Sequence, residues 1–547
     1  MAGYIGSKMS VTLVGGGTFN SDVTFEDNAD IITASAGTSN FRAGVNAGNS
    51  IASGGNYNVV VGDEAGTAIT TGDYNVAIGY IAGDAITTGE RNVIAGYSAG
   101  GALTVGGSNT AIGDRALLAD TQGSSSVAIG RNALFAQNFT SATTVYNVAI
   151  GRDAGASIST GIQNTLIGGL TGDALTVGTK NNAMGYRALS FDTQGSKSVA
   201  IGNFSLASQN FTSATDTYNT AVGHAAGEGI TTGVQNTLTG GLAGDALTDA
   251  DYNVAIGYAA LTSDTLGSRS VAIGTNALNA QNFTSATNTY NTAVGNNAGE
   301  SITTGTGNTF LGASAGDGTD NGNNNTAVGY IALNANCGDE NTAVGENALG
   351  RCTGSTNTAV GKDAGEYVTS GSNNILLGPD TGVSGSPGGQ ITTGTNNIVV
   401  GDENNDAAYI QIDWTVASDQ RDKTDFTALD LGLDFVKALS PVTYKWDKRS
   451  KYGDKRADDY DLNAQTPDGT HKEDWLDIGF KAQEVEALEI AAGYKIADKT
   501  NLVTSLTSDG KQYGMQYSKF VPILVKAIQE LSAKNAALEA RIATLEG

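Results

Sequence analysis

The sequence predicts a mainly β protein, in which a solenoid of about 20 short, stacked coils precedes a small α+β domain that ends in a coiled coil. Three observations predict this arrangement. A five-residue unit recurs along residues 58–401, glycine accounts for 75 of the 547 residues, and the composition changes near residue 415. Residues 1–417 carry a formal charge of −21 with 12 Lys and Arg, whereas residues 418–547 carry −4 with 18. The chain therefore joins two different kinds of structure.

The repeated unit reads Asn or Ser, a small or branched residue, usually Ala, a branched residue and Gly, and it occurs 20 times. Most steps between units are 17 residues long, with three of 21, two of 16 and a last one of 23. The 21-residue steps carry a four-residue insertion within 137–143, 209–215 and 281–287, each after an "SVAIG" unit, and they recur every 72 residues. A fixed period is typical of repeat proteins, in which each unit covers its neighbour.

One unit, "NVAIG", alternates as a strand does, with Val76 and Ile78 on one face and Asn75 and Ala77 on the other. The second half of the repeat predicts another short strand around Ile86 and a Thr-Gly turn. So thin a coil buries only one or two branched residues per strand. We therefore expect partner chains to cover its second apolar face.

The recurring glycine has two explanations: a tight turn with close backbone approach, or a cradle for phosphate. The glycine recurs in all 20 units, whereas a phosphate-binding loop occurs once in a protein. The recurrence therefore favours a tight turn with close backbone approach. A calcium-binding β-roll has a nine-residue period with a fixed Asp, whereas the acidic positions here drift. Cys337 and Cys352 lack metal-site spacing. We expect no metal site and no cofactor.

Charge and hydropathy argue against other classes of protein. The net charge of −25 disfavours a nucleic-acid partner, which needs clustered Lys and Arg. The sequence has no run of 18 apolar residues, so no membrane insertion is expected. The opening "MAGYIGSKMSVTL" lacks the long apolar stretch of a secretory signal.

The units of residues 58–401, "SVAIG" above all, resemble the head repeats of trimeric autotransporter adhesins of the YadA type. The resemblance implies a left-handed parallel β-roll with three chains side by side, and hence a homotrimer. The repeats here are longer than that family's typical unit. That family's secretion signal and membrane-anchor barrel are not recognised in the sequence, so we do not expect a bacterial surface autotransporter.

The last 130 residues predict short helices and strands. Residues 429–439 predict a helix ending before Pro441, "VTYKW" predicts a strand, and "DIGFKAQEVEAL" predicts a strand that leads into a helix. A heptad seam predicts a coiled coil from residue 519. Ile at a with Leu at d favours two strands, but the repeats favour three, and we expect three. The seam consists of Leu524, Ile528, Leu531, Asn535, Leu538, Ile542 and Leu545.

Three separated motifs, "SDQRDK" at 418–423, "GFKAQEVE" at 479–486 and "YGMQYSKFVPILVKAIQEL" at 513–531, resemble one known family. It is the peptidase S74-type intramolecular chaperone domain, which ends many phage tailspikes and tail fibres. The resemblance implies that this domain helps three chains assemble. It also implies that the domain then cuts itself off between Ala417 and Ser418.

The resemblance implies Ser418 as nucleophile and Lys423 as its activating base, with Asp419 and Arg421 supporting the motif through hydrogen bonds. A serine hydroxyl needs a base to take its proton, and a lysine can serve when burial or a nearby cation lowers its pKa. The spacing alone also fits an exposed turn between domains, but the two downstream motifs favour self-cleavage. The attack is either an N→O acyl shift within the chain or an attack from another chain.

The parts together predict a phage tail fibre of the virion tail, made in the host cytoplasm. Its receptor on the host surface would be a glycan or an outer-membrane protein. The expected parts are a base for attachment to other tail or baseplate proteins at 1–50, the repeats at 51–405, a linker at 406–417, the chaperone domain at 418–518 and the coiled coil at 519–547.

Aromatic residues at the insertions are candidate receptor contacts, unless they fill the core of the trimer. One alternative function is a tailspike that also degrades host polysaccharide, and another is a non-viral adhesive or ice-binding solenoid. The sequence shows neither paired carboxylates on a recurring groove nor flat T-x-T arrays. No substrate-turnover enzyme is expected beyond self-cleavage. The candidate contacts are Phe139, Phe211, Phe283, Tyr146, Tyr218 and Tyr290.

Overall fold

The computed structural model describes residues 35–411, 415–455, 457 and 459–547. It divides the chain into two units, Met1–Asn164 and Thr165–Gly547. Most of the predicted N-terminal base therefore lies outside the described residues.

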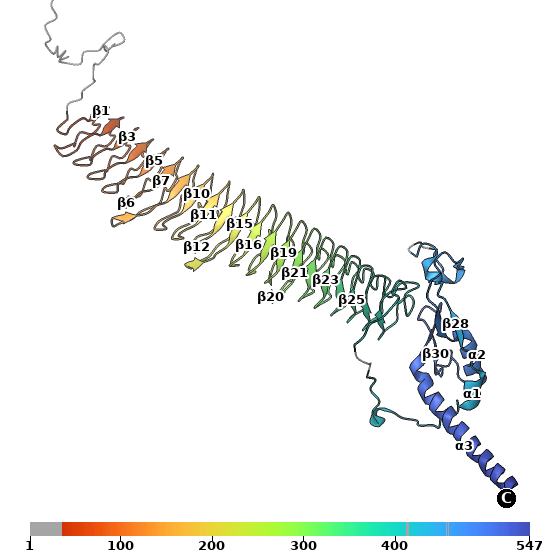
Figure 1. Cartoon of the computed structure of the whole chain (residues 1–547). Coiled ribbons are helices and arrows are strands. Elements are labelled where there is room, and N and C mark those ends of the chain that lie inside the picture. The colour runs from red at the N-terminus through yellow and green to blue at the C-terminus, as the bar shows by residue number, and fades with distance from the viewer. Residues whose placement is uncertain (1–34, 412–414, 456, 458) are drawn as a thin grey trace, which may run out of the picture. The chain divides into compact units, whose positions relative to one another are not determined.

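Unit 1 is a stack of three-residue strands that pair in parallel, one strand to a coil (Figure 1). The pairing is in register, so that Val76 lies beside Val93 in the next coil. The stack begins before the predicted repeats, because "NFRAG" is a further unit that Phe41 and Arg42 disguise. The strands are β1 (Phe41–Ala43), β2 (Val59–Val61), β3 (Val76–Ile78), β4 (Val93–Ala95), β5 (Thr110–Ile112), β7 (Val127–Ile129) and β9 (Val148–Ile150), with a short pair β6 (Gly123–Ser124) and β8 (Thr143–Thr144).

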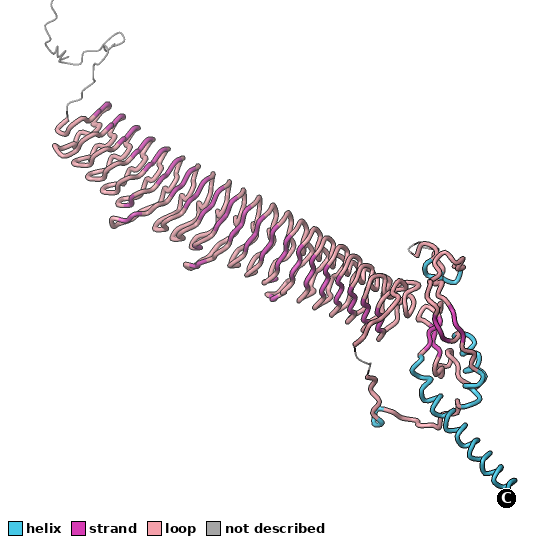
Figure 2. Tube along the Cα trace, viewed as in Figure 1, coloured by secondary structure: helices cyan, strands magenta, loops and turns pink. Residues whose placement is uncertain are grey.

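Unit 2 begins with coils of the same kind, and Figure 2 shows that turns and loops make up the rest of each coil. The predicted β-solenoid of about 20 coils is confirmed. Its strands are β10 (Thr165–Ile167), β11 (Asn182–Met184), β13 (Val199–Ile201), β15 (Thr220–Val222), β16 (Thr237–Thr239), β17 (Val254–Ile256), β19 (Val271–Ile273), β21 (Thr292–Val294), β22 (Thr309–Leu311), β23 (Thr326–Val328), β24 (Thr342–Val344), β25 (Thr358–Val360), β26 (Ile375–Leu377) and β27 (Ile398–Val400), with short pairs β12 (Gly195–Ser196) with β14 (Thr215–Asp216) and β18 (Gly267–Ser268) with β20 (Thr287–Asn288).

The coil core is built differently from what the sequence predicted. In β3, Ala77 is fully buried and Ile78 is 44% exposed, so the small central residue points inward and the branched residue points outward. The second half of the repeat supplies the larger core side chain, since Ile86 is fully buried. The predicted strand around Ile86 is a turn, because Gly83 adopts a φ of +54° and Ile86 N donates to Gly83 O at 3.2 Å.

The repeated Asn forms a buried ladder through the coils. The backbone N of Asn75 donates to Asn58 Oδ1 at 2.8 Å, and Asn92 N donates to Asn75 Oδ1 at 3.1 Å. The Asn75 Nδ2 donates in turn to Gly89 O at 2.8 Å. Each buried carboxamide thus has partners on both sides, as buried polar groups require. The ladder explains why Asn opens most units.

At the "SVAIG" units a glutamine side chain takes the place of the missing asparagine in this ladder. At Ser198 the smaller side chain leaves room for the Gln209 carboxamide, whose Nε2 donates to Ser198 Oγ at 2.9 Å and to Asp192 Oδ2 at 2.6 Å. The Gln209 Oε1 accepts from Asn219 Nδ2 at 2.9 Å, which resumes the ladder. The 72-residue period therefore corresponds to one buried Asp–Gln–Asn network for each long coil.

Replacing Asp192 by asparagine is expected to weaken unit 2 locally. The Asp192 Oδ1 accepts from Gly195 N at 2.9 Å and from Phe211 N at 3.2 Å, so all of these neighbours are donors. Burial raises the pKa of Asp192, and these hydrogen bonds oppose that shift. An asparagine NH₂ would face a donor and reduce the local opening free energy by about 1–3 kcal/mol.

Hydrogen exchange across residues 192–219 measures this opening free energy. The matched control is Asp216→Asn, an exposed residue paired with Lys197, for which we expect under about 1 kcal/mol. Equal effects of the two substitutions would contradict the role of the buried network.

The C-terminal part of unit 2 contains two small antiparallel sheets and three helices, packed around Phe435, Val485, Val503 and Phe520. The predicted strand in "VTYKW" and the strand leading into a helix are both present. The tail helix places Pro522 in its first turn, where proline is tolerated. The elements are η1 (Gln420–Asp422), α1 (Leu433–Ala438), β28 (Val442–Tyr444), η2 (Arg449–Lys451), η3 (Leu462–Ala464), β29 (Asp477–Gly479), α2 (Ala482–Ala491), β30 (Thr504–Leu506), β31 (Tyr513–Met515), η4 (Tyr517–Lys519) and α3 (Phe520–Glu546).

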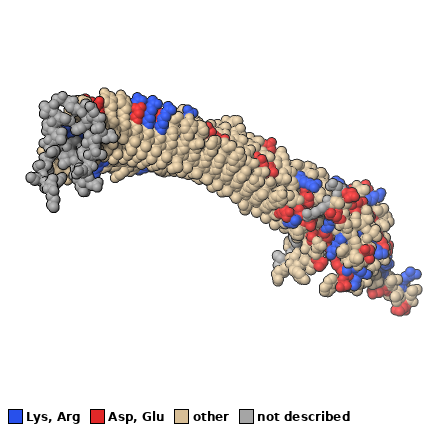
Figure 3. All heavy atoms as spheres, turned by 90° about the horizontal axis from the view of Figure 1, so that it is seen from above, with Lys and Arg blue, Asp and Glu red and all other residues tan. Residues whose placement is uncertain are grey.

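Charge is distributed unevenly over the surface. Figure 3 shows Lys, Arg, Asp and Glu gathered over the C-terminal part of unit 2, while the coils present mostly uncharged residues in that view. Among the described residues, no helix has both the length and the apolar character needed to cross a bilayer.

Candidate self-cleavage site

The motif "SDQRDK" folds into a single tight turn. Asp419 precedes η1 and caps it, since its Oδ1 accepts from Arg421 N at 2.9 Å. The turn closes when Lys423 N donates to Gln420 O at 3.2 Å. A spacing of five residues places two side chains on different sides of a regular helix. This short turn instead brings the two ends of the motif back together.

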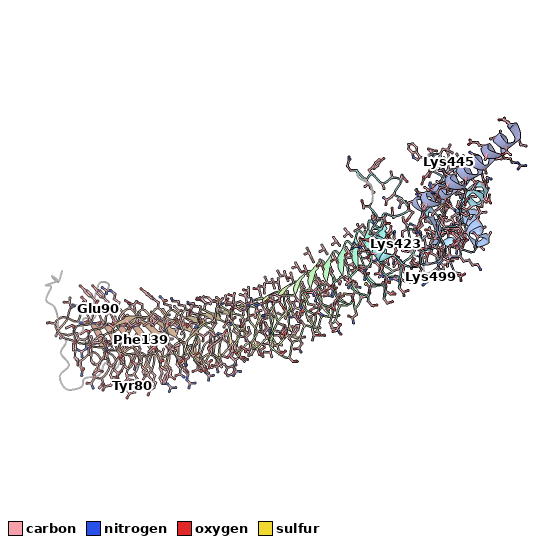
Figure 4. The ribbon with its side chains drawn as sticks, turned by 90° about the horizontal axis from the view of Figure 1, so that it is seen from below. Tyr80, Glu90, Phe139, Lys423, Lys445 and Lys499 are labelled. Atoms are coloured by element: carbon pink, nitrogen blue, oxygen red, sulfur yellow. The ribbon has the colours of Figure 1, made fainter. Side chains whose placement is uncertain are left out.

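The side-chain nitrogen of Lys423 meets the Ser418 side chain within one chain. Its Nζ lies 2.6 Å from Ser418 Oγ and 3.4 Å from Ser418 O. This is the contact that a nucleophile and its base require. Figure 4 labels Lys423 among the side chains of this region.

Asp419 and Arg421 form a bidentate ion pair beside this contact. The Arg421 Nη2 lies 2.6 Å from Asp419 Oδ2, and its Nε lies 3.1 Å from both carboxylate oxygens. The hydrogen bonds from Arg421 lower the pKa of Asp419 and the same pair raises the pKa of Arg421. The geometry gives both residues a part in shaping the turn.

Every residue from Thr415 to Lys423 is exposed in the single chain. A lysine becomes a base most readily where burial disfavours its charged form. The turn therefore brings the Ser418 and Lys423 side chains together but leaves them exposed to water.

The insertion aromatics divide into two groups. Phe139, Phe211 and Phe283 are buried in their own coils, so in the single chain their rings lie neither on the surface, where a receptor would bind, nor on a face open to partner chains. Their backbone N–H groups bond to the buried Asp, which ties each ring to the network described above. Figure 4 labels Phe139.

The insertion tyrosines remain exposed, by 58% at Tyr146, 51% at Tyr218 and 61% at Tyr290. Lys197 Nζ donates to the Tyr218 hydroxyl at 2.9 Å and pairs with Asp216 at 2.6 Å. This pairing with Asp216 raises the pKa of Lys197. The exposed candidates for a surface contact are therefore the three tyrosines.

Sequence reasoning missed Glu489, which organises the C-terminal domain. This carboxylate is buried on α2 and accepts from the backbone N of Leu502 at 2.7 Å, Val503 at 2.7 Å and Thr504 at 3.1 Å. It holds the segment that leads into β30 against the helix. A glutamate on an amphipathic helix ordinarily lies in solvent, so nothing at this position of the sequence predicted that the carboxylate is buried.

Residues 418–494 match the protein-family model described as "Chaperone of endosialidase", of the Peptidase_S74 family. The match begins at Ser418, the first residue of the turn that holds the Ser–Lys contact. A search of curated proteins finds no match, and a search of solved structures finds none either. The chain thus carries a β-solenoid followed by a chaperone-of-endosialidase domain, which is consistent with assembly as a homotrimer.

Proposed function

We propose that this protein is a trimeric phage tail fibre of the virion tail. Its shaft, residues 1–417, recognises a host surface, and its C-terminal domain assists assembly and then cuts itself off. The observation that carries this proposal is the Ser418–Lys423 contact at the start of the chaperone-of-endosialidase domain. Receptor class and tail partners follow from the fibre assignment: a host glycan or outer-membrane protein, and other tail or baseplate proteins near the N-terminus.

An apolar outer face on the coils supports the trimer. Met184 and Ile201 lie side by side on β11 and β13, and both are exposed in the single chain. Contiguous exposed apolar surface of this kind marks an interaction site in a folded protein. The face is lined with branched side chains on most strands, so it suits a second and third copy of the same chain.

The tail helix α3 supports the same conclusion independently. Its heptad residues Ile528 and Leu545 are 66% and 79% exposed. A seam of Ile and Leu is stable only when it packs against other helices. Both apolar surfaces are therefore covered when three chains lie in parallel.

The cut follows from the contact by balanced steps. The Ser418 Oγ attacks the carbonyl carbon of Ala417 as its proton passes to Lys423 Nζ, and that proton then goes to the departing Ser418 nitrogen. The C–N bond breaks and an ester joins Ala417 to Ser418 Oγ. Water then hydrolyses the ester, leaving a carboxylate on Ala417 and restoring the hydroxyl. A partner chain packed over the exposed turn would supply the dry surroundings that a lysine base needs.

Native mass measurement and binding to bacterial outer membranes test the fibre assignment. We expect three shafts per particle, and binding to membranes from a susceptible bacterium. Replacing Tyr146, Tyr218 and Tyr290 together by alanine should reduce that binding by about tenfold or more without changing the number of shafts per particle, because exposed aromatics dominate such contacts. A monomeric particle would refute the trimer, and unchanged binding would refute the tyrosine contacts.

A further inference from the structure

The last coil is longer than the repeat requires. The step from Asn374 to Asn397 is 23 residues instead of 17. The strands of these coils nevertheless pair in register, with Leu376 beside Val399, so the additional residues are not needed for stacking. They form the segment Ser384–Gly389, "SGSPGG".

This segment and Gln390 are bonded to the domain on the far side of the Ala417–Ser418 bond. The Gln390 N donates to Asp509 Oδ2 at 3.0 Å, and Ser508 Oγ donates to Gln390 O at 3.2 Å. The Gln512 Nε2 reaches Gly385 O at 3.5 Å. One short turn, 507–512, therefore bonds to the backbone at both ends of the inserted segment.

The glycines of the segment allow this close approach. At Gly385, with a φ of +92°, an added Cβ would lie 2.3 Å from Ser450 Cβ. At Gly389, with a φ of +73°, it would lie 2.7 Å from Thr507 Cβ. Both positions face residues of the C-terminal domain, so the segment is shaped to receive that domain.

Glu403 forms a second anchor between the same two parts. It is only 6% exposed, and its carboxylate pairs with Lys455. Its backbone O accepts from Lys448 Nζ at 2.9 Å, and Lys448 also pairs with Glu473 at 3.1 Å. A buried carboxylate requires a cation or several hydrogen-bond donors beside it. Here the lysine that pairs with the Glu403 carboxylate and the lysine that bonds to its backbone both come from the domain beyond the cut.

We propose that the seat, Ser384–Gln390 together with Glu403, holds residues 418–547 on the shaft after the Ala417–Ser418 bond is cut. Cleavage and release are then separate steps, and release requires these hydrogen bonds and ion pairs to break. The cut itself belongs to the proposed function, whereas the seat is present before any bond is broken.

Native gel filtration of the cut protein tests the seat, with the cut fraction measured on a denaturing gel. We expect residues 418–547 to elute with the shaft, and Gly385→Ala to increase the free piece by about tenfold or more, because the added Cβ collides with Ser450. The matched control is Gly469→Ala, which has a φ of +91° but nothing within 4 Å of the added Cβ. The proposal would be overturned if residues 418–547 of the unaltered protein separated from the shaft as soon as they were cut. It would also be overturned if the two variants released equal amounts of the free piece.

A charge exchange provides a second test that avoids backbone strain. Glu403→Lys and Lys455→Glu should each release the piece by about tenfold or more, because each leaves a like-charged pair at the anchor. The double variant should restore retention towards that of the unaltered protein. Failure of the double variant to recover would show that the ion pair does not hold the domain.

The seat can be tested even if no self-cleavage occurs. In the Ser418→Ala chain, a recognition sequence for a site-specific protease can be inserted between Ala407 and Ala408, which are both exposed. Retention after that cut supports the seat, whether or not the unaltered chain cuts itself. Loss of the piece after that cut overturns the seat.

Discussion

Replacing Ser418 by alanine is expected to leave a single 547-residue chain, whereas the unaltered protein yields a shaft of 417 residues and a piece of 130. The physical reason is the Lys423 Nζ–Ser418 Oγ contact of 2.6 Å, which places a proton acceptor beside the one hydroxyl of "SDQRDK". Without that oxygen no ester forms, and we expect the rate of cutting to fall by at least about 10³-fold. Denaturing mass spectrometry measures both products.

Lys423→Met and Lys423→Arg should block the cut to a similar extent. Methionine removes the amine, while arginine keeps the positive charge but does not accept a proton at neutral pH. A control is Lys445→Met, because Lys445 is exposed on the same domain, and it should cut normally (Figure 4). Normal cutting by Lys423→Arg would assign the lysine a purely structural role.

Glu489→Ala should unfold the C-terminal domain. The substitution leaves the buried N–H groups of Leu502, Val503 and Thr504 without their acceptor. Bonds to a charged acceptor contribute about 1.5–3 kcal/mol each, so the loss exceeds about 3 kcal/mol and is comparable to the stability of a small domain. Assembly of the trimer and the cut should both decline as a result.

Hydrogen exchange of residues 482–506 and the yield of trimer report this loss. The matched control is Glu484→Ala on the same helix, where the carboxylate is exposed and pairs with Lys481 at 2.8 Å. That exposed pair should contribute under about 1 kcal/mol. Full protection of residues 482–506 in Glu489→Ala would show that the three backbone bonds are dispensable.

The sequence predicted the coils because their period is repeated many times, and it predicted the Ser–Lys pair through a family motif. It could not predict which strand face turns inward, because Val76 and Ile78 look like core residues and the buried Ala77 does not. The inward face depends on the diameter of the coil, which leaves room for a small side chain at the centre of most strands. The same limit applies to Phe139, for which the sequence left open a receptor contact or the core of a trimer, whereas the ring packs into its own coil.

Buried charges were the other failure of prediction. Glu403 lies in the polar run "DENND" and Glu489 lies between Leu488 and Ile490, and in neither case do the neighbouring residues identify the groups that pair with the buried carboxylate. Their partners, the backbone N–H groups before β30 and the lysines of the C-terminal domain, lie 13 to 52 residues away along the chain. Such partners become visible only when the chain has folded.

The Asn ladder also determines how the length of this fibre can change. Ser198 N donates to Asn181 Oδ1 at 2.9 Å, and Ser270 N donates to Asn253 Oδ1 at 2.8 Å. Recombination that removes residues 198–269 would join Asn181 to Ser270 through the same bond and leave every buried carboxamide matched. The fibre would be shorter by four coils, about 19 Å at the usual strand spacing. Deletion or duplication of 72 residues can therefore change the length of the solenoid in whole periods without a compensating mutation.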